Sequence, residues 1–163
     1  MTSLTRHHGG AVIALTFVAA MILTIMPLPE DLRVFRPDWT LLVLVYWALA
    51  LPLRIGVGIG WLVGIFQDVL TGSLLGQHAL SYSIVAYLTL KLHQRIRLYP
   101  LWQQALSVLV LLTLGQLLIL WVNGMIGRPI TSWLYWSPSV FGAAVWPVVY
   151  VILRSLRRQF RVT

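Results

Sequence analysis

The stretch that decides the fold is residues 56–76, GVGIGWLVGIFQDVLTGSLLG. Every fourth residue in this stretch is glycine or aspartate: Gly56, Gly60, Gly64, Asp68, Gly72 and Gly76. Residues four apart lie on one face of a helix, so the spacing predicts a face that is almost bare of side chains. Small residues on such a face let membrane helices approach closely. We therefore predict that these five glycines pack against a neighbouring helix.

Asp68 lies on the same face as the glycines. A carboxylate inside an apolar segment is costly in lipid, so it should point into protein or a wet cavity and should have a partner. Two interpretations remain open at this point. Asp68 is either a structural hydrogen-bonding group or a functional one.

Composition predicts an integral membrane protein. Of the 163 residues, 59% are hydrophobic and only 10% are charged, against about 25% charged in ordinary soluble domains. Mean hydropathy is +0.84. The net charge of +8 comes from basic residues at the ends of apolar runs, as the positive-inside bias produces, rather than on one polar face. This distribution argues against nucleic acid as a partner.

No residue pattern indicates catalysis, a metal or a cofactor. The chain has no cysteine, which excludes disulfides and thiolate chemistry. Its histidines are scattered, and none has a metal-ligand spacing with a carboxylate. The serines lack a Gly-x-Ser-x-Gly turn, and the glycines are spaced for a helix face rather than for a phosphate loop.

Apolar runs predict membrane spans at about residues 11–26, 39–52, 55–70, 74–90, 101–122 and 139–153, in a single domain covering 1–163. The first run resembles a signal peptide but lacks an Ala-x-Ala site, so we expect it to be retained. Residues 39–70 as one helix would be about 48 Å long, too long for a hydrocarbon core of about 30 Å. Pro52-Leu53-Arg54 breaks the run, which favours a hairpin of two short spans.

The fold expected is therefore an all-α bundle of six transmembrane helices with both ends in the cytoplasm. Six spans place nine basic residues inside and three outside, the outer ones being Arg33, Arg36 and Arg128. A five-span alternative gives nine against two but leaves Arg54 in lipid, at a cost of about 2.5 to 3.5 kcal/mol. We favour six spans on that ground.

The polar residues of the outer side give one candidate cluster. Asp38 begins one predicted span and Asp68 ends the next, so the two carboxylates could meet as an acid-base pair. An ion pair with Arg36 is the favoured interpretation. His78 either extends this cluster or is an ordinary interfacial histidine. On the inner side, a basic tail is expected to contact anionic lipid or an acidic partner: Arg154, Arg157, Arg158 and Arg161.

Several segments together resemble one family. They are FRPDW at 35–39, YWALALP at 46–52, GWLVG at 60–64 followed by Asp68, Gly72 and Gly76, LWQQAL at 101–106, and Trp146-Pro147 before a basic tail. In combination they are similar to the rod shape-determining protein MreD. Gln67 departs from the family pattern, which more often has an apolar residue before the aspartate.

This resemblance implies a non-enzymatic protein of the bacterial inner membrane that belongs to the cell-elongation machinery. It implies partners as well: the periplasm-facing protein MreC, the filament protein MreB, and the peptidoglycan polymerase and transpeptidase. The family is similar in architecture to the substrate-binding components of energy-coupling-factor transporters. That similarity leaves a small-molecule or lipid-binding membrane subunit as the alternative function. An intramembrane enzyme is a third, less favoured class.

Overall fold

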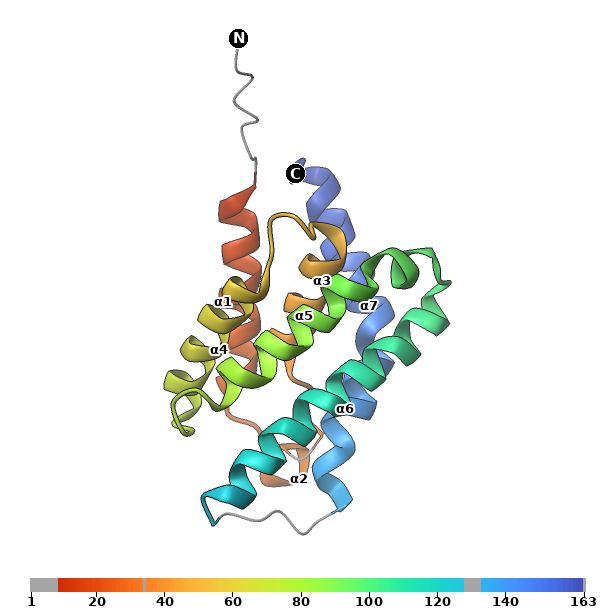
Figure 1. Ribbon diagram of the computed structural model, residues 1–163. Helices are drawn as coiled ribbons and strands as arrows, with labels where there is room; N and C mark the ends of the chain where they lie inside the picture. The colour runs from red at the N-terminus through yellow and green to blue at the C-terminus, as the bar shows by residue number, and fades with distance from the viewer. Residues whose placement is uncertain (1–8, 34, 128–132, 163) are drawn as a thin grey trace.

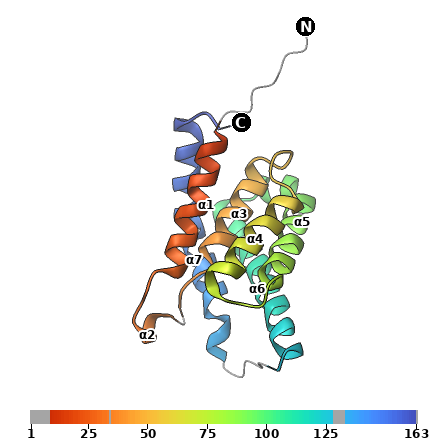
Figure 2. The same cartoon turned by 90° about the vertical axis from the view of Figure 1, so that its left-hand side faces the viewer.

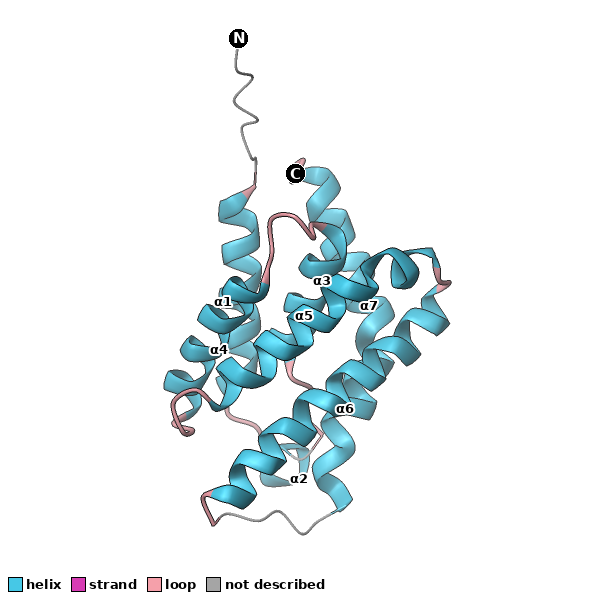
Figure 3. Ribbon diagram, in the orientation of Figure 1, coloured by secondary structure: helices cyan, strands magenta, loops and turns pink. Residues whose placement is uncertain are grey.

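A computed structural model describes residues 9–33, 35–127 and 133–162, whose regular structure is helical (Figures 1 and 3). The helices are α1 (Gly10–Ile25), α2 (Glu30–Arg33), α3 (Trp39–Ala50), α4 (Val57–Thr71), α5 (Gln77–Leu98), α6 (Leu101–Met125), the 3-10 helix η1 (Trp133–Trp136) and α7 (Ser137–Gln159). The N-terminal end of α1 and the C-terminal end of α7 lie at one end of the bundle, and the C-terminal end of α6 and the N-terminal end of α7 lie at the other (Figure 1).

Helix α3 is the core of the bundle. All ten residues from 40 to 49 are buried, so no side of this helix is left open. A helix that is apolar all round lies either inside a protein core or in lipid. α3 contacts α1, α5 and α7 most extensively, and these elements enclose it (Figure 2). Its short length is therefore tolerated, because protein surrounds it on every side.

The chain breaks between α3 and α4. α3 ends at Ala50 and α4 begins at Val57, with a turn that contains Pro52 and Arg54. The Ile55 amide donates to the Leu51 carbonyl at 3.0 Å and closes that turn. A proline inside a helix removes a hydrogen bond and clashes with the preceding turn. The alternative of one helix over residues 39–70 is therefore wrong.

Among the described residues, two elements are each long and apolar enough to cross a membrane: α6, and η1 together with α7 over Trp133–Gln159. α1, α3 and α4 are shorter apolar helices. α5 continues to Leu98, past the apolar run that was expected to end at residue 90. Its last two turns carry Lys91, Arg95 and Arg97. Such residues are good helix formers, and cations near a helix C-terminus are favourable.

Close approach between helices occurs at glycines. A Cβ added to Gly64 would lie 2.4 Å from the Ala79 Cα, and one added to Gly60 would lie 3.0 Å from the Tyr82 carbonyl oxygen. α4 and α5 are accordingly the most extensively paired helices. Gly115 and Gly142, which the spacing argument missed, have similarly close neighbours on other helices.

The predicted glycine face is too long. Gly56, Gly72 and Gly76 have no atom within 4 Å of an added Cβ, so they do not pack against a helix. The physical reason is that α4 spans only Val57–Thr71, so all three glycines lie outside it. Gly72 and Gly76 lie in the α4–α5 loop with φ angles of 67° and 100°, a left-handed conformation that glycine adopts without a Cβ penalty. Their role in the structure is to turn the chain.

Candidate functional site

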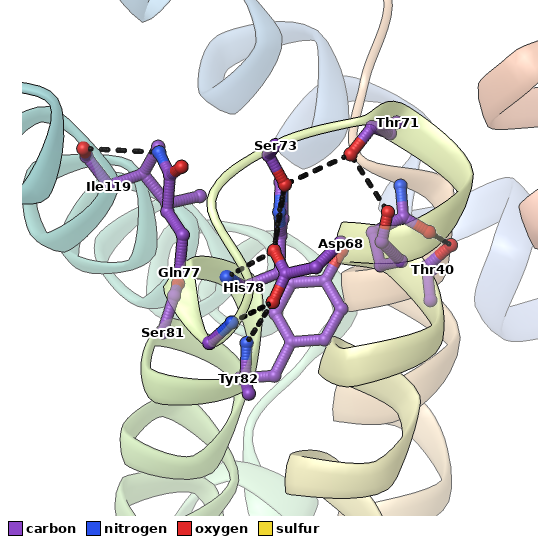
Figure 4. Close-up of polar contacts among 12 residues, drawn as sticks. Thr40, Asp68, Thr71, Ser73, Gln77, His78, Ser81, Tyr82 and Ile119 are labelled. Atoms are coloured by element: carbon purple, nitrogen blue, oxygen red, sulfur yellow. Dashed lines mark hydrogen bonds and ion pairs between the residues drawn. The ribbon is translucent and has the colours of Figure 1, made fainter.

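The candidate site is a network of polar groups where α4 ends and α5 begins. Asp68, in the last turn of α4, is 1% exposed. Its two carboxylate oxygens accept hydrogen bonds from the Gly76 amide at 2.8 Å, the His78 amide at 2.8 Å and the Ser73 hydroxyl at 2.8 Å. The His78 Nδ1 lies 2.7 Å from the same carboxylate (Figure 4).

These contacts cap α5. The N-cap residue Gly76 has no side chain to accept from the first amides of that helix, and such amides need partners when they are buried. Asp68 supplies the acceptor from the preceding helix. Its negative charge also lies where the α5 macrodipole is positive. The loop folds back on Asp68 because Gly72 and Gly76 both adopt positive φ.

The arrangement of Ser73, His78 and Asp68 does not make a nucleophile. In a catalytic triad the serine and the carboxylate bond to different nitrogens of the imidazole. Here the Ser73 Oγ lies 3.2 Å from Nδ1, the nitrogen that also faces Asp68. The Ser73 hydroxyl donates to Asp68. Ser73 and His78 therefore hold the Asp68 carboxylate in place and close the α4–α5 loop.

Asp38 is held by a separate set of donors. It is the N-cap of α3 and accepts from the Leu41 amide at 3.2 Å. The buried Tyr82 hydroxyl of α5 donates to both its oxygens, at 2.8 and 2.9 Å. The Tyr82 ring in turn packs edge to face against His78, with centroids 5.7 Å apart. Asp38 and Asp68 thus lie in one network, joined through Tyr82 and His78.

Gln67, the departure from the family pattern, has a specific partner. The Thr40 hydroxyl of α3 donates to its Oε1 at 3.1 Å, and both side chains are buried (Figure 4). This bond links α4 to the core helix. Sequence reasoning missed Thr40, Ser73 and Tyr82. The sequence could have indicated Tyr82, because it lies four residues after His78 and therefore on the same helix face. A buried tyrosine hydroxyl also usually finds a hydrogen-bond partner.

The predicted ion pair between Arg36 and Asp68 is wrong. The Arg36 guanidinium donates instead to the carbonyl oxygens of Thr24 and Met26. The last carbonyls of a helix have no partner within it, and a cation there is favoured by the macrodipole. Arg36 therefore caps the C-terminal end of α1. Asp68 has an imidazole and backbone amides as its partners.

The other predicted residues lie apart from this network. Arg154, Arg157 and Arg158 are in the last turns of α7, and Arg161 follows the helix. They lie at the end of the bundle that holds the C-terminal ends of α3 and α5, opposite the Asp68 network (Figure 1). Arg6 and Arg128 are outside the described residues. Within those residues, no group of three His, Cys, Asp or Glu could hold a metal ion.

A bundle of apolar helices with its charges gathered near its ends is typical of helical membrane proteins. Residues 5–156 match the family model for the rod shape-determining protein MreD, and the chain belongs to that family. It is 34% identical over 149 residues to the rod shape-determining protein MreD of Haemophilus influenzae, covering 89% of this chain and 90% of that protein. These findings confirm the family resemblance.

No solved structure matches the chain. The expected similarity to energy-coupling-factor components therefore stays a prediction. The family is one of shape-determining proteins rather than of enzymes.

Proposed function

We propose that this protein is a non-enzymatic scaffold subunit of the bacterial cell-elongation complex, spanning the inner membrane several times. Its proposed partners are MreC, the peptidoglycan polymerase and transpeptidase, and MreB, which it contacts indirectly or through cytoplasmic loops. Family membership supports the role in rod shape. Helix packing and the outer loops would provide the contacts with membrane partners.

The observation that carries the membrane part of the proposal is the surface of the outer helices. Trp61 and Phe66 of α4 are 51% and 60% exposed, and Val110 of α6 and Val151 of α7 are 67% and 54% exposed. Soluble monomers rarely expose contiguous apolar patches larger than a few hundred Å². Apolar side chains facing outward on several helices instead suit lipid and the single helices of partner proteins.

In the proposed arrangement of six membrane spans, the spanning helices are α1, α3, α4, α5, α6 and α7. Arg54, the cationic end of α5 and the arginine tail of α7 would then face the cytoplasm, in line with the positive-inside bias. Asp38, Asp68 and His78 would lie near the periplasmic side. The scaffold would present this side and its outer helix faces to partners such as MreC, while the polar network holds α3, α4 and α5 together.

Photo-crosslinking in the native bacterium tests the scaffold. A photoreactive residue would replace Phe66, Val110 or Val151, with the fully buried Trp146 position as the matched inward control. We expect one outward face to crosslink to a protein of the elongation complex, and cells lacking the gene to lose rod shape. Folded variants that crosslink at none of these faces, in cells that keep their shape without the gene, would overturn the proposal.

The alternative, a small-molecule or lipid-binding membrane subunit, is favoured by one observation. A cavity of about 500 Å³ opens at the basic end of the bundle. Mass spectrometry of the natively purified protein distinguishes the two functions. Co-purifying wall-synthesis proteins would favour the scaffold, and one stoichiometric small molecule would favour the binding subunit.

A further inference from the structure

The cavity at the basic end of the bundle is lined by five arginines: Arg97, Arg154, Arg157, Arg158 and Arg161. They converge from two helices, because Arg97 is at the end of α5 and the others are at the end of α7 or just beyond it. Its volume of about 500 Å³ lies within the range of about 300 to 1,000 Å³ that is usual for small-molecule sites.

No acidic side chain of the chain neutralises these arginines. The protein has four acidic residues in all, and they lie in α2, at the start of α3 and at the end of α4: Glu30, Asp31, Asp38 and Asp68. Those positions are at the opposite end of the bundle from the cavity (Figure 1). Like charges gathered around one space repel each other unless an anion lies between them.

Helix dipoles do not account for the cluster by themselves. A cation in the last turn of a helix is favoured, which suits Arg97 on α5 and Arg157 on α7 separately. That effect acts within each helix and gives no reason for the two sets to line the same cavity. Their convergence indicates a shared negative partner.

The remaining polar lining also presents hydrogen-bond donors. The Tyr46 hydroxyl of α3 lies beside the Arg157 guanidinium. Gln104 of α6 accepts from the Trp146 indole at 3.4 Å through its Oε1, which leaves its amide N–H groups as donors. The Arg154 guanidinium carbon lies 6.0 Å from the centroid of the Tyr150 ring, so that side chain is positioned over an aromatic face.

We propose that this cavity binds a phosphate-bearing group. Several guanidinium forks, which match phosphate oxygens in pairs, and a tyrosine hydroxyl surround a space larger than one hydrogen-bonded ion needs. The phosphate belongs either to an anionic phospholipid headgroup or to a soluble compound. Basic pockets at the cytoplasmic ends of membrane helices suit headgroups, and this lipid source rests on the membrane placement proposed above. Phosphate binding itself does not depend on that placement.

The test uses the full chain purified in detergent. Thermal unfolding and native mass spectrometry would follow the addition of phosphatidylglycerol, phosphatidylcholine or inorganic pyrophosphate. A ligand that binds only the folded protein raises its melting temperature with concentration. We expect phosphatidylglycerol or pyrophosphate to do so and phosphatidylcholine not to. A response to phosphatidylglycerol alone assigns the site to a lipid, and a response to pyrophosphate assigns it to a soluble phosphate compound.

Matched variants separate the cavity from general positive charge. Arg157→Gln should weaken binding about tenfold or more, since it removes a charge-assisted hydrogen bond. Arg95→Gln removes one charge from the same end of the bundle, outside the cavity lining, and should leave binding unchanged. If Arg157→Gln does not fold, Tyr46→Phe should still show weakened binding.

Three results would overturn the proposal: no response to either phosphate source, equal losses in Arg157→Gln and Arg95→Gln, or an acidic protein bound at these arginines in place of a phosphate. This assay needs no elongation complex. It therefore fails or succeeds independently of the crosslinking test of the scaffold.

Discussion

Asp68 caps a helix to which it does not belong. Its carboxylate is buried, yet it accepts from two amides at the start of α5, from a hydroxyl and from the neighbouring imidazole. Hydrogen bonds to a charged group offset the free-energy cost of burying it in the interior of a protein. The local contacts therefore account for Asp68 without a further ligand. The spacing of the sequence placed it beside a helix face but gave no information about which donors the loop would bring to it.

Removing Asp68 should destabilise the protein strongly and independently of Arg36. Asp68→Ala leaves the amides of Gly76 and His78 and the Ser73 hydroxyl without their acceptor, so we expect a loss of about 3 to 5 kcal/mol. Arg36→Ala frees the carbonyls of Thr24 and Met26 at the C-terminal end of α1, at about 1 to 2 kcal/mol. The two residues share no partner, so the double variant should cost the sum. Chemical unfolding in detergent measures all three.

A double variant that costs clearly less than the sum would show that Arg36 and Asp68 interact directly. His78→Ala is the control for the imidazole, and it should cost less than Asp68→Ala because the backbone donors remain. If Asp68→Asn leaves the protein folded and inserted while cells lose rod shape, Asp68 has a functional role beyond capping.

At the scale of elements, α4 and α5 form the most extensive helix pair. Gly60 and Gly64 face α5, whereas Gly58 has no atom within 4 Å of an added Cβ. The four-residue spacing was informative only where the backbone is helical, which is why it failed at Gly72 and Gly76. Gly115 and Gly142 also lie at close contacts, but each is isolated in the sequence. Their positions form no repeat that would predict close packing.

Alanine substitutions should rank by the space around each glycine. Gly64→Ala places a methyl group 2.4 Å from the Ala79 Cα, and because backbone must move we expect a loss of about 2 to 3 kcal/mol. Gly60→Ala, with a closest contact of 3.0 Å, should cost less. Gly58→Ala should gain up to about 1 kcal/mol from helix propensity alone. Thermal unfolding of the purified variants gives the order, and equal effects at Gly58 and Gly64 would contradict close packing of α4 on α5.

At the scale of the whole molecule, charge separates along the bundle. The acidic residues lie at one end, and the arginine cavity lies at the other. The sequence indicated part of this separation, because the basic residues of α5 and α7 follow the apolar runs of those helices. The sequence could not predict that other helices enclose α3. Ten consecutive apolar and small polar residues look the same whether protein or lipid surrounds them.

Labelling at two exposed leucines tests the predicted orientation of the bundle. The chain contains no cysteine, so a single introduced thiol reports one position. Leu53, in the α3–α4 turn, and Leu75, in the α4–α5 loop, are both open to the surroundings, and Leu75 is 67% exposed. With six spans and both ends inside, an impermeant maleimide should label Leu75→Cys in cells with an intact inner membrane. It should label Leu53→Cys only after that membrane is opened.

The cysteine-free parent is the control, because any labelling of it would be non-specific. Labelling of Leu53→Cys from the periplasm would reverse the orientation, and the arginine cavity would then face away from the cytoplasm. No labelling of Leu53→Cys under either condition would place the turn within the lipid and would contradict six spans. Arg54 adjoins that position, and burying its charge would cost about 2.5 to 3.5 kcal/mol. Six spans are therefore the expected outcome.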